Sequence, residues 1–309
     1  PRSSQRSSPR SSPLFSPLSS PVAPSEMDTV LALWASKTVP FRETCETAGM
    51  RVGVSGAAGQ MGRTVCAAVE SDPDLELAVA VDRNGAGQSI SGIEVSTELR
   101  AFADAGCEVV VDFTVADAAR ATLPWLAMHG IHAVVGTTGF TAEDLALFES
   151  TFGGDAKVPG SPNCLIAPNF AISAVLMMRF AEMAAPWFDT AEVIELHHNR
   201  KIDAPSGTAM AIGEAIADEI GRDLSECAVY GREGETGERD QQTIGFATVR
   251  AGDVVGEHTA LFADIGERLE ITHKASSRLT FAKGAVKAAS WIIGKPAGLY
   301  DMEDVLGFK

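Results

Sequence analysis

The sequence lacks the features expected of a membrane protein or of a protein that binds nucleic acid. It has no run of eighteen apolar residues, and its longest candidate, residues 172–178, ends at Arg179, so we expect no membrane-spanning helix. Basic side chains are also scarce, because 25 Lys and Arg stand against 41 Asp and Glu. The net charge of −16 argues against a diffuse basic surface for nucleic acid or anionic membranes.

Cysteine is equally sparse in the 309 residues, and no two cysteines form a CxxC pair. An odd number without such pairs favours neither a disulfide framework nor a thiolate zinc site. We therefore expect a soluble cytoplasmic protein without a structural metal. The five cysteines are Cys45, Cys66, Cys107, Cys164 and Cys227.

The first 25 residues contain ten serines, six prolines and no acidic residue. A segment of this composition cannot bury enough apolar surface to offset its ordering entropy. Residues 1–49 are therefore expected to form a disordered leader outside the fold. A transit peptide, which would allow a plastid location, competes with an over-extended reading frame, because Met50 directly precedes the first convincing strand. The second interpretation is slightly favoured.

From Met50 onward, short apolar strands alternate with helical stretches. Strands are expected at residues 51–55, 75–81, 108–113 and 132–135, and helices at residues 61–70 and 116–128. Nearly continuous apolar strands between helices are typical of a parallel sheet that is covered on both faces. The pattern predicts a Rossmann-type doubly wound α/β domain over residues 50–168, to which an apolar helix at residues 281–293 returns, so that residues 279–309 belong to it.

The second half predicts an α+β domain over residues 169–278. A strand at residues 193–197 and a helix at residues 208–220 precede three alternating strands, at residues 243–249, 258–264 and 268–273. We expect an open, mostly antiparallel sheet with these three strands in a meander. Proteins usually cover such an open sheet by oligomerisation.

A glycine-rich turn joins the first strand to the first helix. Its sequence, GAAGQMG over residues 56–62, permits close backbone approach and places a helix N-terminus where a pyrophosphate would bind. Asp82, at the end of the next strand, suits a ribose diol, and Arg83 suits a 2′-phosphate. A glycine turn without a ligand is the alternative, and the combined strand, turn, helix and acid argue against it.

Two later turns have weaker signals. Residues 136–139 (GTTG) follow a strand at the sheet edge where ligands bind, and their two hydroxyls suit a carboxamide, but a plain turn explains them equally well. The segment 167–170 (APNF) is similar, because Asn169 needs hydrogen-bond partners that a purely structural role would also supply.

The most informative segment, residues 195–208 (ELHHNRKIDAPSGT), lies between a strand and a helix start. One of its two imidazoles suits a general acid. Ser206-Gly207-Thr208 would offer N–H groups to a carboxylate, and Lys201 would add charge beside it. A small carboxylate substrate is therefore expected. Taken alone, the residues favour this site no more than a solvated basic loop in which Ser206 merely caps the helix.

Other chemistry receives less support. Adjacent histidines lack the spacing of zinc ligands on a helix, and no cysteine is near them. No serine lies in a GxSxG motif. The four isolated histidines are expected to be structural, and these are His129, His132, His258 and His273.

Taken together, these motifs resemble those of the bacterial 4-hydroxy-tetrahydrodipicolinate reductase family, formerly called dihydrodipicolinate reductase. The resemblance rests on HHNRKIDAPSGTA, GAAGQMG, GTTGF and residues 244–275, and it extends from about Met50 to Phe308. It implies reduction by NADH or NADPH, without a metal, in the diaminopimelate route to lysine, with loss of water from the hydroxylated substrate. A homotetramer that assembles through the second sheet is also implied.

The resemblance further implies residue roles. His197 would donate a proton with Lys201 as its partner, and His198, Gly207 and Thr208 would bind the dicarboxylate. The residues implied to line the dinucleotide are Gly56, Ala57, Ala58, Gly59, Gln60, Met61, Asp82, Arg83, Gly136, Thr137, Thr138, Ala167, Pro168, Asn169 and Phe170.

One departure is a glycine- and proline-containing stretch at residues 152–162, which is expected to form an enlarged loop away from these motifs. Two rival functions are another dinucleotide-dependent dehydrogenase and a dinucleotide sensor that has lost its chemistry. The first has no reason to carry HHxxKxDAPSGT. The second should have lost His197, Lys201 or the carboxylate-binding turn, and all of them are present.

Overall fold

The computed structural model describes residues 49–153 and 161–309. The leader expected over residues 1–49 and the centre of the loop expected over residues 152–162 lie outside the described residues. Among the helices of the described ranges, none is both long and apolar enough to cross a bilayer.

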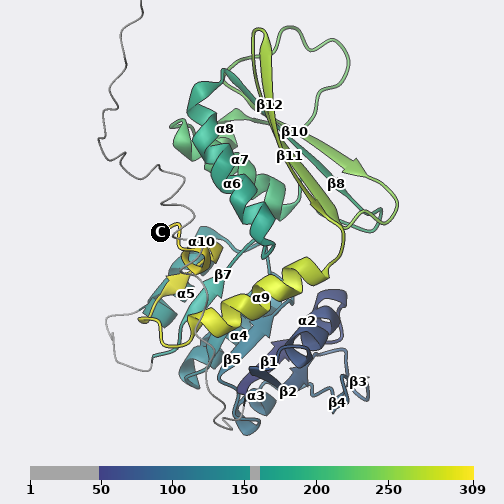
Figure 1. Cartoon of the computed structure of the whole chain (residues 1–309), viewed down its shortest axis with the longest axis vertical. Helices are drawn as coiled ribbons and strands as arrows, with labels where there is room; N and C mark the ends of the chain where they lie inside the picture. The colour runs from purple at the N-terminus through teal and green to yellow at the C-terminus, as the bar shows by residue number, and fades with distance from the viewer. Residues whose placement is uncertain (1–48, 154–160) are drawn as a thin grey trace, which may run out of the picture. The chain divides into compact units, whose positions relative to one another are not determined.

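The first sheet contains six parallel strands in the order β13-β7-β6-β5-β1-β2 (Figure 1). Strands β1, β2, β5 and β6 confirm the four strands expected from the sequence, whereas β7 and β13 were not anticipated. The strand bounds are β1 Met50–Ser55, β2 Leu75–Val81, β5 Val109–Asp112, β6 His132–Val135, β7 Cys164–Ile166 and β13 Leu299–Tyr300. A short hairpin, β3 Ser89–Ile90 with β4 Ile93–Glu94, lies beyond β2.

Helices cover both faces of this sheet. On one face, Val109 and Val111 of β5 join an apolar core with α2, α9 and α10. On the other face, Val110 joins a second core with α3, α4 and α5. This two-sided burial explains the continuous apolar strands and confirms the doubly wound interpretation. The helices are α2 Gln60–Glu70, α3 Arg100–Asp104, α4 Ala116–Met128, α5 Ala142–Gly153, α9 Leu279–Ile292 and α10 Met302–Leu306.

The second sheet has the order β12-β11-β8-β10-β9. Strands β12 and β11 pair antiparallel, as do β11 and β8, but β10 pairs parallel with both β8 and β9. The predicted three-strand meander is therefore wrong in one detail, because β8 lies between β10 and β11. The strands are β8 Thr190–His197, β9 Ala228–Val229, β10 Ile244–Arg250, β11 Gly256–Asp264 and β12 Glu267–Ala275.

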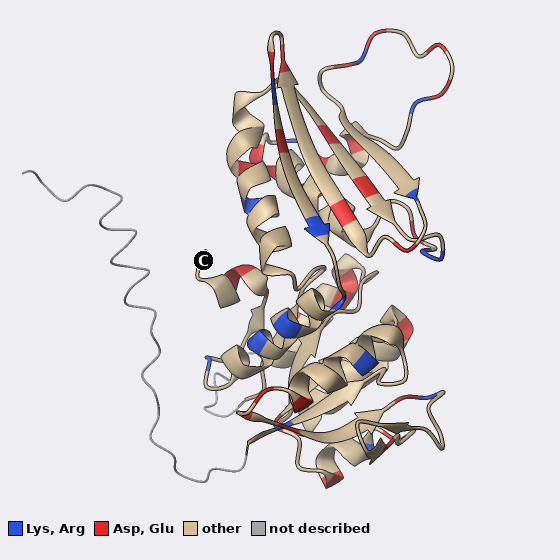
Figure 2. Ribbon diagram, turned by 45° about the vertical axis from the view of Figure 1, so that its right-hand side comes forward, with Lys and Arg blue, Asp and Glu red and all other residues tan. Residues whose placement is uncertain are grey.

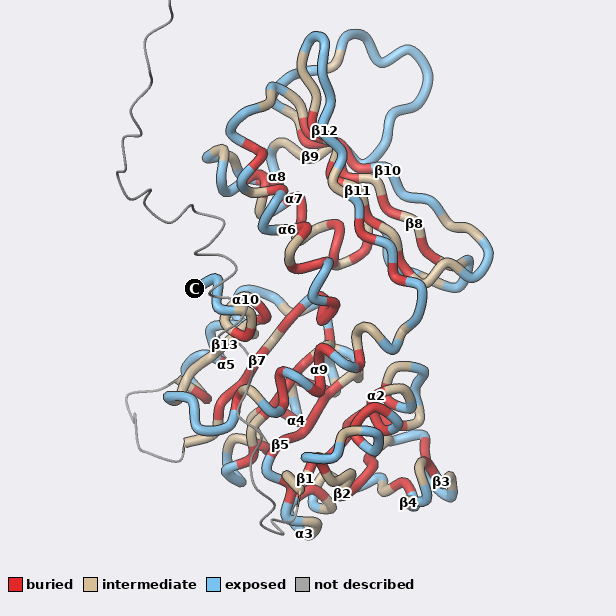
Figure 3. Tube along the Cα trace, in the orientation of Figure 1, coloured by how far each residue is buried: buried red, intermediate tan, exposed pale blue. Residues whose placement is uncertain are grey.

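Helices cover one face of this second sheet. Along β8, buried residues alternate with half-buried ones, so that Ala191, Val193, Glu195 and His197 share the covered face (Figure 3). Helices α6 and α7 pack on this face and form a third core. Here the helices are α6 Ile172–Ala184, the 3-10 turn η1 Ala185–Trp187, α7 Gly207–Glu219 and α8 Leu224–Cys227. Acidic residues are spread over both sheets and their helices (Figure 2).

Candidate active site

The glycine-rich turn follows β1 and leads into α2, as predicted. Gly56 has φ +75°, which L side chains rarely adopt, and a Cβ on Gly62 would come within 2.1 Å of the Gly56 carbonyl oxygen. Only glycine at both positions lets α2 begin so close to the turn. Gly59, the residue before α2, provides no side-chain cap. The first N–H groups of α2 are therefore left for a ligand such as a phosphate.

Asp82 is bound to this turn. Its Oδ2 accepts a hydrogen bond from the Ala58 N–H at 3.0 Å, and its Oδ1 accepts one from the Asn84 N–H at 2.8 Å. The N–H groups of Gly56 and Ala57 both donate to the Val81 carbonyl oxygen. These bonds fix the carboxylate at the end of β2, and its remaining lone pairs are available to a ligand.

A cavity of about 610 Å³ opens beside this turn. Among the residues expected to bind the dinucleotide, Gly56, Gly59, Asp82 and Arg83 line it. Three further lining residues were not expected from the sequence: Arg100 in α3, Val115 directly before α4, and Trp125 in α4. An apolar wall beside two arginines and a carboxylate suits a nucleoside with an attached phosphate.

Of the two hydroxyls in the GTTG turn, only one is available to a ligand. Thr137 is buried, and its Oγ1 donates to Asp112 Oδ1 at 2.8 Å and accepts from the Thr114 N–H. Thr138 is exposed instead, and a Cβ on Gly207 would lie 3.4 Å from its Cγ2. The turn therefore borders the start of α7.

Asn169 connects the segment after β7 with the start of α7. It follows β7, is 7% exposed, and accepts a hydrogen bond from the Ala171 N–H at 2.8 Å. Its Nδ2 donates to Thr208 Oγ1 at 3.1 Å. The segment expected to hold the cofactor thus bonds directly to a residue expected to hold the substrate.

His197 is the last residue of β8 and lies on the covered face of the second sheet. Its Nδ1 bonds to a carboxylate oxygen of Glu195, which is 1% exposed. Because an ionised carboxylate only accepts, Nδ1 carries the proton and Nε2 can exchange one with a ligand. Burial lowers the pKa of His197, Glu195 opposes this effect, and Lys201 and Arg250 lower the pKa further.

His198 lies beyond the end of β8, so the two adjacent imidazoles take different environments. Its Nδ1 is buried and has no hydrogen-bond partner among the described residues. Desolvation lowers the pKa of His198, as do the charges of Arg278, Arg200 and Lys201. Lys201 itself bonds to Asp203 Oδ2 at 2.9 Å. Three cations therefore lie close enough to His198 to disfavour its charged form, and one of them, Lys201, is paired with Asp203.

The start of α7 has the features of an anion site. Ser206 caps the helix through its Oγ, which accepts from the Ala209 N–H at 3.2 Å. The same Oγ lies 3.0 Å from His258 Nε2. This capping leaves the N–H groups of Gly207 and Thr208 to an external carboxylate.

A cavity of about 370 Å³ brings these parts together. It contains His197, His198 and Lys201 with Thr208 on one side and Gly136 with the segment 167–170 on the other. Met61 lines it as well, whereas residues 56–60 of the glycine-rich turn do not. The described residues contain no group of three or more His, Cys, Asp or Glu arranged to hold a metal ion.

Several residues of this cavity were missed or assigned another role from sequence. His258 and His273, expected to be merely structural, both line it, and their rings stack at 6.4 Å. Burial lowers the pKa of His258 to about 3. Arg278 lines the cavity from the beginning of α9. The pairing of β11 with β8 and β12 brings in both histidines, and a sequence read locally carries no signal of that pairing.

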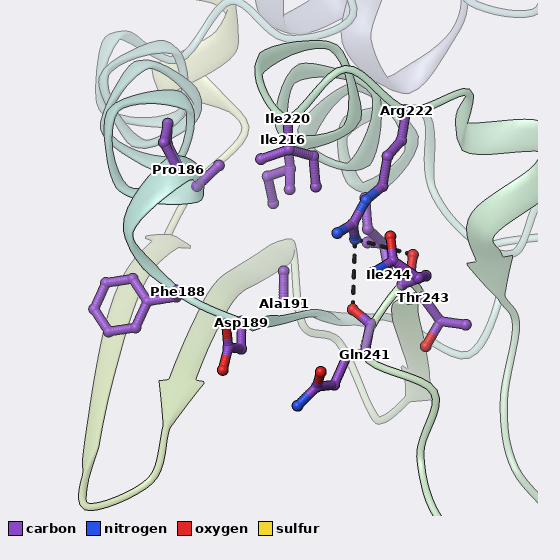
Figure 4. A pocket seen from close by; sticks show the side chains of 12 residues that line it. Pro186, Phe188, Asp189, Ala191, Ile216, Ile220, Arg222, Gln241, Thr243 and Ile244 are labelled. Atoms are coloured by element: carbon purple, nitrogen blue, oxygen red, sulfur yellow. Dashed lines mark hydrogen bonds between the residues drawn. The ribbon is translucent and has the colours of Figure 1, made fainter.

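A smaller cavity of about 180 Å³ beneath the end of α7 has different chemistry (Figure 4). None of its twelve lining residues is a histidine or a lysine. Its arginine, Arg222, donates to the carbonyl oxygens of Gln241 and Gln242, so its guanidinium fixes the chain that precedes β10. This cavity is therefore not the candidate active site.

Family models and relatives agree with this geometry. The model described as dihydrodipicolinate reductase, N-terminus, matches residues 50–170, and the model for the C-terminus of the same enzyme matches residues 173–306. A relative from Alkalilimnicola ehrlichii named 4-hydroxy-tetrahydrodipicolinate reductase is 47% identical over 271 residues, which is 83% of this chain and 98% of the relative. A relative of the same name from Thiobacillus denitrificans is 47% identical over 84% of this chain and 99% of its own length.

Among solved structures, dipicolinate-bound dihydrodipicolinate reductase from Paenisporosarcina sp. TG-14 is similar, with a TM-score of 0.65 and 27% identity. That match covers 83% of this chain and 99% of the other. The sequence motifs, the two sheets and the two family models agree over nearly all of the described residues. The chain belongs to the dihydrodipicolinate reductase family.

Proposed function

We propose that this chain reduces (2S,4S)-4-hydroxy-2,3,4,5-tetrahydrodipicolinate to tetrahydrodipicolinate in the diaminopimelate route to lysine. The reaction adds a hydride and a proton and releases water. The observation that carries the proposal is the cavity that holds His197, Lys201 and the start of α7 beside Gly136 and residues 167–170. The residues proposed as acid catalyst, carboxylate site and nicotinamide site line one cavity in a member of this reductase family, which supports the proposal.

The dinucleotide would lie along the carboxyl edge of the first sheet. The uncapped start of α2 suits the pyrophosphate, and a Cβ on Gly59 would already lie 3.2 Å from the Gly56 carbonyl oxygen. Asp82 would accept hydrogen bonds from the ribose hydroxyls of NADH, and Arg83 would face the 2′-phosphate of NADPH. A bound reduced nicotinamide supplies the hydride. Both cofactors therefore fit this edge.

The full dinucleotide site comprises the residues implied by the family resemblance. Gly136, Thr138 and the segment from Ala167 to Phe170 would border the nicotinamide, whereas Thr137 would shape the turn through Asp112. The turn residues from Gly56 to Met61 would follow the pyrophosphate. No metal is required by this set, since the helix start supplies the positive potential.

The substrate carboxylates would bind at the start of α7 and beside the basic segment. The Gly207 and Thr208 N–H groups would hold one carboxylate, while Lys201 would supply positive charge and His198 a hydrogen bond for the dianion. This anion site is local, because the chain as a whole carries a net charge of −16. A small dicarboxylate is thus the proposed ligand.

His197 is the proposed proton donor and Lys201 its partner. In the free protein, burial keeps the pKa of His197 below its ordinary value. A dianionic substrate beside the ring favours the charged imidazolium and raises this pKa. Substrate binding therefore loads the proton that His197 then gives to the reacting ring.

We assign residues 50–168 and 279–309 to dinucleotide binding and residues 169–278 to substrate binding and oligomerisation. Helix α9 packs against α2 and against the first sheet, which supports the return of the chain to that part (Figure 1). The face of the second sheet opposite α6 and α7 carries the partly exposed Ile194 and Leu196. A homotetramer in the cytoplasm would cover this face.

A coupled assay tests the proposal. The full chain is mixed with the synthase that makes the substrate from pyruvate and aspartate semialdehyde, and the absorbance of NADH or NADPH is followed separately. Nicotinamide oxidation that depends on the synthase supports the reductase, and the two rates give the cofactor preference. If the folded chain binds NADH but oxidises none, the sensor or another dehydrogenase replaces this proposal.

A further inference from the structure

We propose that Glu195, held by Arg250, is the positioning residue that aligns the proton donor His197 with the carboxylate site at the start of α7. This inference rests on the proposed role of His197. Glu195 is 11 residues from Ser206, which caps α7, and 55 residues from Arg250 in the sequence, yet it bonds to both.

The first part of the argument is the contact with His197. Both side chains point to the covered face of β8, because residues two apart on a strand share a face. The Glu195 carboxylate accepts the Nδ1–H of His197, which leaves Nε2 for the substrate. A Cβ on Gly256 would lie only 3.1 Å from this Nε2, so the ring is confined from the β11 side as well.

The second part is the contact with the helix start. Oε1 of Glu195 accepts a hydrogen bond from the Ser206 N–H at 3.2 Å. Ser206 is the residue that caps α7. One buried carboxylate thus fixes both the orientation of the imidazole and the position from which the Gly207 and Thr208 N–H groups project.

The third part is the arginine that holds the carboxylate. Arg250, at the end of β10, donates to both Glu195 oxygens at 3.1 Å. Its Nη2 also donates to the Asp203 carbonyl oxygen at 2.6 Å, which ties down the segment that carries Lys201. The parallel pairing of β10 with β8 places Arg250 directly opposite His197. Buried charges are retained when they are paired and hydrogen-bonded in this way.

A matched carboxylate on the same strand has none of these contacts with the site. Glu192 faces the opposite side of β8 and also pairs with two arginines, Arg232 and Arg239. It does not line the cavity that contains His197. Glu192→Gln therefore removes the same charge from the same strand but leaves the contacts of Glu195 unchanged.

The test compares Glu195→Gln, Glu192→Gln, His197→Gln and the Glu195→Gln/His197→Gln double variant of the full chain. For Glu195→Gln, kcat is expected to fall at least about tenfold, within the range of general acid catalysis, with the affinity for NADH unchanged. The double variant should turn over within about threefold of His197→Gln alone, because Glu195 acts on the proton transfer through His197. Glu192→Gln should match the wild type.

The pH profile gives a readout that a merely structural role would not change. Since Glu195 raises the pKa of His197, its neutralisation should move the decline of kcat at high pH to lower pH. The charged or titratable groups around this imidazole are Glu195 on β8, Lys201 and Asp203 after it, Arg250 on β10 and His258 on β11. The carboxylate site is probed with dipicolinate, whose affinity should fall more in Glu195→Gln than in His197→Gln, because only the first variant also weakens the bond to the Ser206 N–H at the start of α7.

The possible failures are distinguishable. Wild-type kcat in His197→Gln contradicts the proton-donor role on which this inference rests, whereas a wild-type chain that oxidises no NADH or NADPH in the coupled assay contradicts the proposed function itself. Impaired His197→Gln combined with wild-type kcat, pH profile and dipicolinate affinity in Glu195→Gln overturns the positioning role alone. If Glu195→Gln does not fold, Arg250→Lys replaces it, because lysine cannot span both carboxylate oxygens and the Asp203 carbonyl. The same fall in kcat is then expected, and its absence overturns the inference.

Discussion

The side chain of Asn169 donates a hydrogen bond of 3.1 Å to the hydroxyl of Thr208. Asn169 follows β7 of the first sheet, whereas Thr208 lies in the first turn of α7 on the second. Both residues line the same cavity. This bond places the proposed nicotinamide and carboxylate sites side by side, as a hydride transfer between two bound molecules requires.

Asn169→Ala should therefore affect catalysis as well as stability. It leaves the Ala171 N–H and the Thr208 hydroxyl without their partners, at a cost of about 1–3 kcal/mol in the free energy of unfolding. It should also raise the KM for substrate, because Thr208 loses the donor that orients it. Denaturant unfolding and steady-state kinetics measure the two effects.

Asn163 supplies the matched control. It is buried before β7 and bonds to Ile292, Lys295 and Gly298 through its amide. Asn163→Ala should destabilise the fold with no change in KM. An equal rise in KM for both variants would contradict the link between Asn169 and the substrate site.

Asp82 and Arg83 should divide the cofactor preference between them. Asp82→Ala should weaken the binding of NADH more than that of NADPH. The affinity for NADH should fall by about tenfold, because the ribose loses its hydrogen bonds to a charged acceptor. Arg83→Ala should weaken the binding of NADPH more than that of NADH, since it removes a cation that faces the 2′-phosphate. Fluorescence titration of both variants with both cofactors measures this. Equal losses in Asp82→Ala would mean that its carboxylate serves only the Ala58 and Asn84 N–H groups.

Gly62→Ala should abolish tight dinucleotide binding. The new Cβ would lie 2.1 Å from the Gly56 carbonyl oxygen, so α2 must move away from the turn, at a cost of about 1–3 kcal/mol in the free energy of unfolding. Gly59→Ala is the comparison, because its Cβ lies 3.2 Å from the same oxygen. Thermal melts with and without NADH measure the rise in Tm that the cofactor causes. This rise should be reduced more in Gly62→Ala than in Gly59→Ala. An equal reduction of the NADH-induced rise in Tm in both variants would show that the close packing of α2 on the turn is not what dinucleotide binding requires.

The motifs that the sequence predicted well are those built from neighbours along the chain. The turn around Gly56, the helix start at Ser206 and the placement of His197 at a strand end all depend on local backbone geometry. The alternating apolar strands likewise predicted the doubly wound sheet, since both faces of β5 are buried. Short-range chemistry is therefore readable before the fold is known.

The parts that depend on strand pairing were not readable. Glu195 meets Arg250 only because β10 pairs parallel with β8, where a meander was expected. His258 enters the site only because β11 pairs with the other edge of β8. Thr137 offered a free hydroxyl in the sequence, but the fold brings Asp112 to it. In each case the deciding partner is at least 25 residues away.

Acid should destabilise the protein below neutral pH. Burial lowers the pKa of His258 from 6.5 to about 3, so the unfolded chain binds this proton more readily than the folded chain. The stability that the neutral ring contributes is complete above pH 6.5 and is lost progressively as the pH falls towards 3. Each such histidine contributes a slope of at most about 1.4 kcal/mol per pH unit to the free energy of unfolding.

Denaturant unfolding between pH 7 and pH 5 measures this slope, above the ordinary range of carboxyl groups. His258→Gln should reduce it, whereas His129→Gln, at an exposed histidine, should leave it unchanged. A wild-type slope in His258→Gln would show that this imidazole takes up its proton in the folded state.

The most direct measurement of the central claim is the turnover of His197→Gln and Lys201→Ala with enzymatically supplied substrate, alongside their affinity for NADH. The account predicts that kcat falls by about 10²- to 10⁴-fold in each, as expected for lost acid catalysis, while NADH binds as in the wild type. Wild-type turnover in either folded variant would contradict the assignment of acid catalysis to this pair.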